Sequence, residues 1–441
     1  RELVTRSVEG PIRRCTLLDI HRRSKQVAKA LLSEGIGLGD RVATLAWNSD
    51  RHMEAWYGIM GIGAICHTIN PRLFADQLIY IFNHAEDRLL FVDTTFLPIV
   101  EAIAPRLESL ERVVVLTDEA HLPDTSLPNT VAYETWLSGA DSDFEWHVFD
   151  ENTAAGLCYT SGTTGNPKGV LYSHRSNLIH GLMVNQPDVF GLTSMDVVLP
   201  IVPMFHANAW ALTFAAPAAG ACMVMPGPGM DGSSIYELLD TEKVTITAAV
   251  PTIWLGLLQY LQETGKQLPH LEKIVIGGAA VPRMMFERFE NDYGVEVIQG
   301  WGMTETSPVG TVGKMKFSNH HLQGDERIDV KVKAGRSLFG VELKIVDDEG
   351  NDLPRDGTAV GHLMVRGPAV SKAYFKHDQD ILDADGYFDT GDIATIDDMG
   401  YVTITDRDKD VIKSGGEWIS SIEIENAAVG CEGVAEAAVI G

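Results

Sequence analysis

The chain reads Tyr159-Thr-Ser-Gly-Thr-Thr-Gly-Asn-Pro-Lys-Gly-Val170 immediately after an apolar run. Glycines let the backbone approach an anion closely, hydroxyl groups donate hydrogen bonds to phosphate oxygens, and a lysine adds positive charge. The segment therefore predicts a phosphate-binding loop, with a flexible Gly/Thr-rich turn as the alternative. Pro167 precedes the lysine and Gly169 follows it, unlike the pattern G-x-x-x-x-G-K-[ST], so an ordinary P-loop kinase or GTPase is disfavoured.

The composition is that of a folded, acidic protein. Of the 441 residues, 45% are hydrophobic and 22% are charged, which argues against disorder. A chain of this length forms about two to four domains or subdomains. The formal net charge is −26 and the pI is about 4.8, a balance that repels nucleic acid and anionic membranes. An anionic substrate therefore needs a local positive site.

The sequence also bears on cellular location. No apolar run approaches the roughly 18 residues of a membrane-spanning helix, and the first residues lack the apolar core of a signal peptide. The cysteines have neither metal-ligand nor paired spacing, and they are Cys15, Cys66, Cys158, Cys222 and Cys431. We expect a cytoplasmic protein with reduced thiols, no integral membrane segment and no nucleic-acid partner.

Alternating patterns in the first 150 residues predict a parallel sheet with helices on both faces. Thr16-Leu-Leu-Asp19 has the spacing of a capping box and predicts a helix that runs to about Ser33. Helical patterns over 52–61 and 97–108 alternate with continuous apolar strands, which are predicted at 41–47, 64–68, 89–92 and 113–116. The polar segment 119–150 is expected to be a surface connection.

A second α/β series follows the glycine-rich segment, and the pattern changes at about residue 330. The second series has a helix over 252–262 and strands predicted at 197–202, 221–225, 244–250, 273–276 and 296–299. Short alternating strands at 341–346, 361–365 and 400–405 then predict a small antiparallel unit. The predicted fold class is α/β, with two doubly wound subdomains at about 1–150 and 151–330 and a small β-barrel subdomain at 331–408.

Three later segments carry polar groups that suit a nucleotide. Gln299-Gly-Trp-Gly-Met-Thr-Glu-Thr306 places a glutamate where it could hold Mg²⁺ on a triphosphate. Asp389-Thr-Gly-Asp392 and Asp406-Arg-Asp-Lys-Asp-Val-Ile-Lys-Ser-Gly-Gly-Glu-Trp418 combine acids that accept hydrogen bonds from ribose hydroxyls with basic side chains. Each segment alone also fits an acidic surface turn.

Together and in this order, segments 159–170, 300–306, 390–392 and 406–416 resemble the core motifs of the adenylate-forming superfamily. That superfamily comprises acyl-CoA synthetases, firefly luciferases and peptide-synthetase adenylation domains, and the resemblance covers essentially the whole chain. It implies that the β- and γ-phosphates of ATP are bound by Thr160, Ser161, Gly162, Thr163, Thr164 and Lys168.

The resemblance also implies roles for residues farther along the chain. Thr304 would contact the α-phosphate, Glu305 would hold Mg²⁺, and Asp392 and Arg407 would bind the ribose hydroxyls. The segments that would flank adenine and the acyl chain are represented by Gly277, Gly278, Ala279, Gln299, Gly300, Trp301, Gly302 and Met303.

The implied reaction has two steps. A carboxylate attacks the α-phosphorus of ATP and pyrophosphate leaves; a mobile C-terminal α+β domain then rotates, and the thiol of CoA displaces AMP. The hinge between 1–408 and 409–441 falls on Lys409, for which a solvated charge is the alternative. Thioester formation would involve Lys413, Ser414, Gly415 and Gly416. The family's Pro-rich loop, whose lysine promotes adenylation, is missing from the sequence, so we expect further residues beyond Gly441.

Pro203-Met-Phe-His-Ala-Asn-Ala-Trp210 stands where the family builds its acyl pocket. It resembles the Phe-His-x-x-x-Trp of fatty acyl-CoA synthetases, in which the tryptophan gates the acyl tunnel and the histidine lines the carboxylate site. His206 and Trp210 would share one face of a helix if the segment is helical, and simple core packing is the alternative. Trp301 would add bulk beside the pocket, so a small or medium acid fits as well as a long one.

The sequence thus predicts an ATP- and Mg²⁺-dependent, AMP-forming carboxylic acid:CoA ligase, expected to be a homodimer. Within the superfamily the chain is similar to medium- and long-chain fatty acid CoA ligases and to 3-methylmercaptopropionate CoA ligases. Two alternatives stay open. One is a luciferase-like or carrier-loading adenylase, and the other is a non-catalytic protein that binds an acyl-adenylate or nucleotide.

Overall fold

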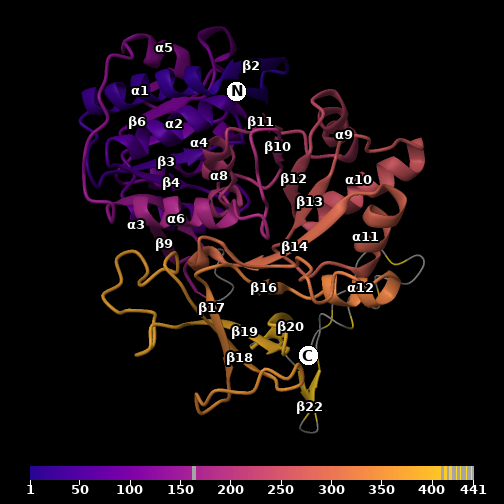
Figure 1. Ribbon diagram of the computed structural model, residues 1–441. Coiled ribbons are helices and arrows are strands. Elements are labelled where there is room, and N and C mark those ends of the chain that lie inside the picture. Colours follow the sequence, from indigo (N-terminus) through magenta and orange to yellow (C-terminus); the bar gives the residue numbers. More distant parts are fainter. Residues whose placement is uncertain are drawn as a thin grey trace. The chain divides into compact units, whose positions relative to one another are not determined.

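A computed structural model describes residues 1–160 and 165–408, the backbone of strands 412–414 and 417–419, and residues 424, 428, 434 and 439. The chain divides into two compact units, whose helices and strands are labelled in Figure 1. Unit 1 comprises Arg1–Leu182, Leu192–Met230 and Ala373–Gln379. Unit 2 comprises Met183–Gly191, Asp231–Lys372 and Asp380–Gly441.

Unit 1 contains a seven-stranded sheet in the order β7-β6-β5-β3-β4-β8-β9. All neighbours are parallel except β8 and β9, which are antiparallel. The strands are β3 (Arg41–Leu45), β4 (Ile65–Thr68), β5 (Leu89–Val92), β6 (Arg112–Val115), β7 (Thr130–Ala132), β8 (Ala154–Tyr159) and β9 (Gly169–Ser173). The α-helices along this part of the chain are α1 (Leu17–Ser33), α2 (Asp50–Gly61), α3 (Ala75–Ala85), α4 (Leu97–Ile103), α5 (Tyr133–Ser138) and α6 (His174–Val184).

Helix α1 begins at the predicted capping box. The Asp19 N–H donates to the Thr16 hydroxyl oxygen over 3.1 Å, and the Thr16 N–H donates to the Asp19 carboxylate over 2.9 Å. The helix packs against α2 at Gly58, where an added Cβ would lie 2.5 Å from a Val27 methyl carbon. The capping box and the end of the helix at Ser33 are confirmed.

A second group of strands in unit 1 has the order β10-β11-β1-β2. β10, β11 and β1 are parallel, and β2 is antiparallel to β1. Its strands and the helices between them are β1 (Glu2–Arg6), β2 (Ile12–Thr16), β10 (Val197–Pro200), α7 (Ala207–Trp210), α8 (Leu212–Ala219) and β11 (Cys222–Met225).

Unit 2 joins a parallel row to an antiparallel one. The parallel strands are β12 (Ile246–Ala249), β13 (Lys273–Ile276) and β14 (Glu296–Gly302). From β14 the order continues antiparallel through β15 (Val309–Val312), β16 (Gly335–Ser337), β20 (Tyr401–Arg407), β19 (Phe388–Ile396), β18 (Gly361–Arg366) and β17 (Glu342–Val346). The α-helices are α9 (Gly232–Thr241), α10 (Pro251–Thr264), α11 (Arg283–Glu287) and α12 (Gly324–Lys331).

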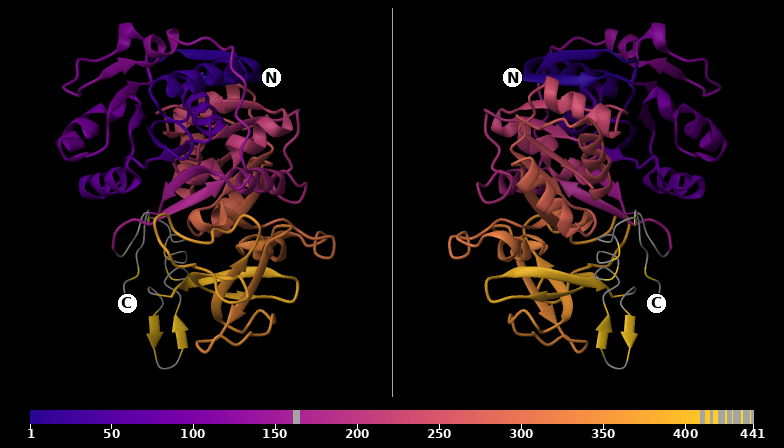
Figure 2. Two further views of the ribbon diagram at one scale, coloured as in Figure 1. Left: turned by 90° about the vertical axis from the view of Figure 1, so that its left-hand side faces the viewer. Right: turned by 90° about the vertical axis from the view of Figure 1, so that its right-hand side faces the viewer.

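The predicted α/β class is confirmed, and β17, β18 and β20 lie where the sequence predicts strands, whereas β16 and β19 match no predicted strand. Closure of these strands into a barrel and the subdomain boundaries stay predictions. Two short strands, β21 (Ile412–Ser414) and β22 (Glu417–Ile419), form an antiparallel pair and lie side by side (Figure 2).

The expectation that 119–150 is only a surface connection is wrong. This segment contains β7, which extends the sheet beside β6, and α5, whose first residue Tyr133 is fully buried. The ring of Trp136 packs edge-on against Phe91, with ring centroids 5.4 Å apart. These aromatic side chains bury apolar surface, which the acidic composition of the segment does not predict.

No helix in the described ranges is both long and apolar enough to cross a lipid bilayer.

Candidate active site

The glycine-rich segment connects the antiparallel strands β8 and β9. At its base, the Thr160 N–H donates to the Lys168 carbonyl oxygen over 2.9 Å, and the Lys168 N–H donates to the Thr160 hydroxyl oxygen over 3.3 Å. These bonds hold the two ends of the segment together and leave the Lys168 side chain exposed. The other predicted phosphate ligands in this segment lie outside the described residues, namely Ser161, Gly162, Thr163 and Thr164.

His206 and Trp210 do not share the face of a right-handed helix. Every residue from Ala207 to Ala211 has a positive φ, between 45° and 66°. His206, with extended backbone angles, precedes this left-handed turn and has an exposed side chain, whereas Trp210 is buried. The condition of the prediction, a right-handed helix through both residues, is therefore not met, and a left-handed turn projects the two side chains differently.

Two polar contacts surround this turn. The buried Asn208 side-chain amide donates to the side-chain oxygen Oδ1 of Asn177 over 3.2 Å, and the Thr213 hydroxyl donates to the Asn208 backbone oxygen over 3.0 Å. Partial desolvation, and then the charge of Arg72, lower the pKa of His206, which favours a neutral imidazole at neutral pH.

In unit 2, the turn after β13 places Gly277 in a buried position and Gly278 and Ala279 in exposed ones. Gly278 has a φ of 80°, a backbone conformation that favours glycine. Gly278 and Ala279 are thus exposed to solvent beside the end of β13.

The end of β14 carries a second set of predicted site residues. Gln299 is 8% exposed, and its side-chain Oε1 has no hydrogen-bond partner among the described residues. An added Cβ on Gly302 would lie 1.8 Å from the Pro308 carbonyl oxygen, so only glycine fits there. An added Cβ on Gly300 would make an ordinary 3.7 Å contact with the Thr311 carbonyl oxygen. β14 therefore carries a buried side-chain oxygen without a hydrogen-bond partner in the described part of the chain, at Gln299, and a close approach of two backbone segments, at Gly302.

Glu305 lies in the turn η5 (Thr304–Thr306) directly after β14 and is 5% exposed. The Met303 N–H donates to the Thr306 hydroxyl oxygen over 3.0 Å, and the Glu305 carbonyl oxygen accepts from the Ser371 N–H over 2.8 Å. These bonds fix the turn that carries Thr304 and the carboxylate.

The chain's donor groups fit a Mg²⁺ ion that arrives with a nucleotide. No three His, Cys, Asp or Glu side chains in the described part of the chain are grouped so that they could hold a metal. Mg²⁺ on nucleotide phosphates commonly uses one or two protein carboxylates and otherwise phosphate oxygens and water. The buried carboxylate of Glu305 matches that requirement.

Asp392, Arg407 and Trp301 form a hydrogen-bonded cluster in unit 2. The Trp301 indole N–H donates to Asp392 Oδ2 over 2.8 Å, and Arg407 Nε lies 2.9 Å from Asp392 Oδ1. β19 and β20 pair Asp392 directly opposite Arg407. Burial raises the pKa of Asp392, while the charge of Arg407 and the indole hydrogen bond oppose that rise.

This cluster joins two of the predicted ribose ligands and adds a third residue to them. Each carboxylate oxygen of Asp392 has a further lone pair, so it can accept a hydrogen bond from a ribose hydroxyl while its protein bonds stay intact. Trp301, expected beside the acyl pocket, thus also binds Asp392, a contact that the sequence does not predict.

Sequence reasoning also missed aromatic residues around the glycine-rich segment. The Lys168 Nζ lies 4.9 Å from the centre of the Tyr374 ring. The Tyr159 hydroxyl is 2.7 Å from Nδ1 of His84, whose ring packs edge-on against Phe375. A pair of aromatic residues followed by a lysine, as in Tyr374-Phe-Lys376, is the only sequence signal for this contact, and it is weak.

Several predicted residues of the C-terminal segment lie outside the described residues. They are Lys409, Gly415 and Gly416, together with the side chains of Lys413 and Ser414.

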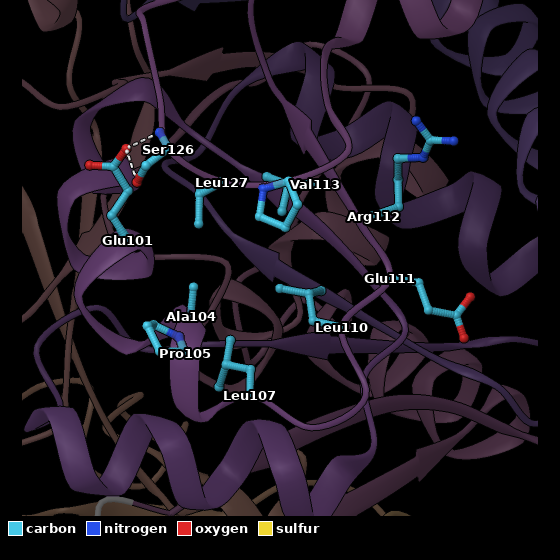
Figure 3. Close-up of a pocket in the computed structure, with 11 residues that line it drawn as sticks. Glu101, Ala104, Pro105, Leu107, Leu110, Glu111, Arg112, Val113, Ser126 and Leu127 are labelled. Atoms are coloured by element: carbon cyan, nitrogen blue, oxygen red, sulfur yellow. Dashed lines mark hydrogen bonds between the residues drawn. The ribbon is translucent and has the colours of Figure 1, made fainter.

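One pocket of unit 1 is lined by none of these residues (Figure 3). It has a volume of about 260 Å³ and is lined mainly by apolar side chains from η2 (Ala104–Arg106), β6 and the segments beside them. At its rim Glu101 accepts hydrogen bonds from Ser126. No predicted site residue lines it, and ligand pockets commonly exceed about 300 Å³. It does not contribute to the candidate site.

Comparisons with known proteins identify the family of this chain. The family model for AMP-binding enzymes matches residues 3–375. The 3-methylmercaptopropionyl-CoA ligase of Ruegeria lacuscaerulensis is 49% identical over 441 residues, which cover 100% of this chain and 82% of that protein. The medium-chain-fatty-acid–CoA ligase of Ectopseudomonas oleovorans is 45% identical over 440 residues, which cover 100% of this chain and 81% of that protein.

A solved structure shows the same fold. The anthranilate CoA ligase AuaEII in complex with anthranoyl-AMP superposes with a TM-score of 0.84 at 25% identity, covering 100% of this chain and 80% of that one. The resemblance to adenylate-forming enzymes that the motifs predict is confirmed. The chain belongs to the family of AMP-binding enzymes.

Proposed function

We propose that this protein is an ATP-dependent, AMP-forming carboxylic acid:CoA ligase that works through an acyl-adenylate. The observation that carries the proposal is the buried Asp392 carboxylate, held by Arg407 and Trp301 and able to accept from ribose hydroxyls. The names of the relatives support the same reaction, since proteins 45% and 49% identical over the whole chain are CoA ligases.

In the first step, an oxygen of the substrate carboxylate attacks the α-phosphorus of ATP, the bond to the β-phosphate oxygen breaks, and pyrophosphate leaves. Both reactants are anions, so catalysis is mainly positioning and neutralisation of charge. Lys168 would bind the leaving phosphates, Thr304 the α-phosphate, and the neutral imidazole of His206 the carboxylate. The Gly277–Ala279 turn and the end of β14 would bind adenine.

Glu305 would hold the Mg²⁺ that accompanies ATP, and Mg²⁺ supplies additional neutralisation of phosphate charge when it is bound.

In the second step, the sulfur of CoA attacks the acyl carbonyl carbon, the bond to the AMP phosphate oxygen breaks, and the thiol proton passes to water. After rotation at Lys409, Lys413 and the Ser414–Gly416 segment would lie at the active site for this step. If Lys409 is the hinge, Lys409→Pro should retain adenylation and lose thioester formation.

The acid is proposed to be a fatty acid or 3-methylmercaptopropionate, because relatives named for both classes cover the whole chain at similar identity. Trp210 is buried and would set the depth of the acyl site. The protein is also proposed to act as a cytoplasmic homodimer, which sedimentation of the full-length protein and cell fractionation would test.

Product analysis tests the proposal. Purified full-length protein with ATP, Mg²⁺, CoA and a panel of acids should yield an acyl-CoA detected by mass spectrometry, together with equal AMP. Adenylate without thioester would favour a luciferase-like or carrier-loading adenylase. ATP binding without either product would favour a non-catalytic nucleotide-binding protein.

A further inference from the structure

One short segment from the second half of the chain packs on the glycine-rich segment. Residues Ala373–Gln379, here called the strap, belong to unit 1, while the residues before and after them belong to unit 2. The Phe375 N–H donates to the Gly169 carbonyl oxygen over 2.7 Å, and Tyr374 forms an antiparallel bridge with Val170. The strap thus pairs with the backbone immediately after Lys168.

Side chains anchor the strap at two further points. A Cβ added to Gly169 would lie 3.1 Å from Phe375 Cβ, so the strap packs directly on the glycine backbone. Lys376 Nζ lies 2.6 Å from Oε1 of Glu86, whose Oε2 is 2.7 Å from an Arg41 guanidinium nitrogen. Because the lysine and glutamate are partly exposed, this ion pair fixes the strap less than the backbone pairing does.

The strap presents the Tyr374 ring to Lys168. The ring packs against Cys158, Val170 and Tyr172, which fixes its plane. Lys168 Nζ lies 4.9 Å from the ring centre, within the distance at which an ammonium is attracted to an aromatic face. An exposed lysine otherwise samples many rotamers, and a fixed ring restricts it to a few that remain beside the loop.

We propose that Tyr374 is a positioning residue that holds Lys168 ready for the β- and γ-phosphates of ATP. The inference rests on the proposed phosphate-binding role of Lys168. Restricting the lysine before ATP arrives lowers the entropy lost on binding, which is the general advantage of preorganisation. The hydroxyl of Tyr374 has no part in this role, because the ring face supplies the attraction.

Calorimetric titration of the full-length protein tests the proposal with two ligands, ATP with Mg²⁺ and AMP, in the absence of any acid. Tyr374→Leu should weaken ATP binding roughly two- to fivefold, the range expected for one exposed cation–π contact. Tyr374→Phe, which keeps the ring face, should bind ATP within about twofold of the wild type. AMP lacks the β- and γ-phosphates, so its affinity should not change in either variant.

A double-mutant cycle separates positioning from a structural effect. In a Lys168→Ala background, Tyr374→Leu should cause no further loss of ATP affinity. An equal loss in both backgrounds, a matching loss of AMP affinity, a Tyr374→Phe protein as weak as Tyr374→Leu, or tighter ATP binding by Tyr374→Leu would overturn the proposal.

The cycle is independent of the proposed ligase activity. If the protein makes no thioester but the cycle shows coupling, the ligase proposal fails and the positioning role stands. If Lys168→Ala leaves ATP affinity unchanged while the wild type makes thioester, the ligase proposal stands and the positioning role fails.

Discussion

Asp392 has two protein partners before any ligand binds. The indole of Trp301 and the guanidinium of Arg407 occupy one lone pair on each carboxylate oxygen and orient the group. Asp392 and Arg407 could be predicted together because each belongs to a short motif. The Trp301 contact joins residues 91 positions apart, and no local pattern encodes it.

At this scale we predict that Asp392→Ala weakens ATP and AMP binding by a similar factor. The ribose is common to both nucleotides, and a hydrogen bond to a charged group contributes about 1.5–3 kcal/mol, or roughly 10- to 150-fold in affinity. Calorimetry with both nucleotides measures the effect. Unchanged affinity for both would remove Asp392 from the ribose site.

Trp301→Phe serves as the matched control, because it keeps an aromatic ring and removes the indole donor. We expect it to weaken both nucleotides less than Asp392→Ala does.

Elements whose signals are local could be predicted, and elements that depend on distant partners could not. The capping box, a motif of four neighbouring residues, defines the start of α1. The spacing of His206 and Trp210 would place them on one face of a right-handed helix, yet the turn there is left-handed. That conformation costs roughly 1–2 kcal/mol per residue, which tertiary packing must offset. β1 was missed because it pairs with β11, far along the chain.

The parallel strands β3 and β5 provide a prediction about pH. Trp47 lies just after β3 and Asp93 just after β5. The Trp47 N–H donates to the buried Asp93 carboxylate over 2.6 Å. Burial raises the pKa of Asp93 from its ordinary value near 4 to about 7, although the Trp47 hydrogen bond opposes the rise. The folded protein therefore binds this proton more tightly than the unfolded chain does.

The stability that this proton provides is fully present below about pH 4 and is lost as the pH rises to about 7. Asp93→Asn keeps an acceptor for Trp47 and removes the titration. The free energy of unfolding of the variant minus that of the wild type should therefore be about 2–4 kcal/mol more favourable to the variant at pH 8 than at pH 5. Urea unfolding at the two pH values measures this difference.

Asp124→Asn removes an exposed carboxyl group and controls for net charge. A difference between Asp93→Asn and wild type that is the same at both pH values would contradict the buried titration.

Across the whole molecule, the α/β class could be predicted because parallel strands covered on both faces are continuous apolar runs. The assignment of Ala373–Gln379 to unit 1 could not, since no change of composition separates these residues from their neighbours in unit 2. The phosphate-binding segment was predicted from its glycines and hydroxyls, whereas the contact between Lys168 and Tyr374 depends on how the whole chain folds. The net charge of −26 makes such local positive groups necessary for an anionic substrate.

Acid-dependent exchange of labelled pyrophosphate into ATP, measured without CoA on the purified full-length protein, tests the proposed adenylation most directly. We expect exchange with at least one acid from a panel of 3-methylmercaptopropionate and short-, medium- and long-chain fatty acids, and none without acid. No exchange with any of them, in a protein that still binds ATP, would contradict it.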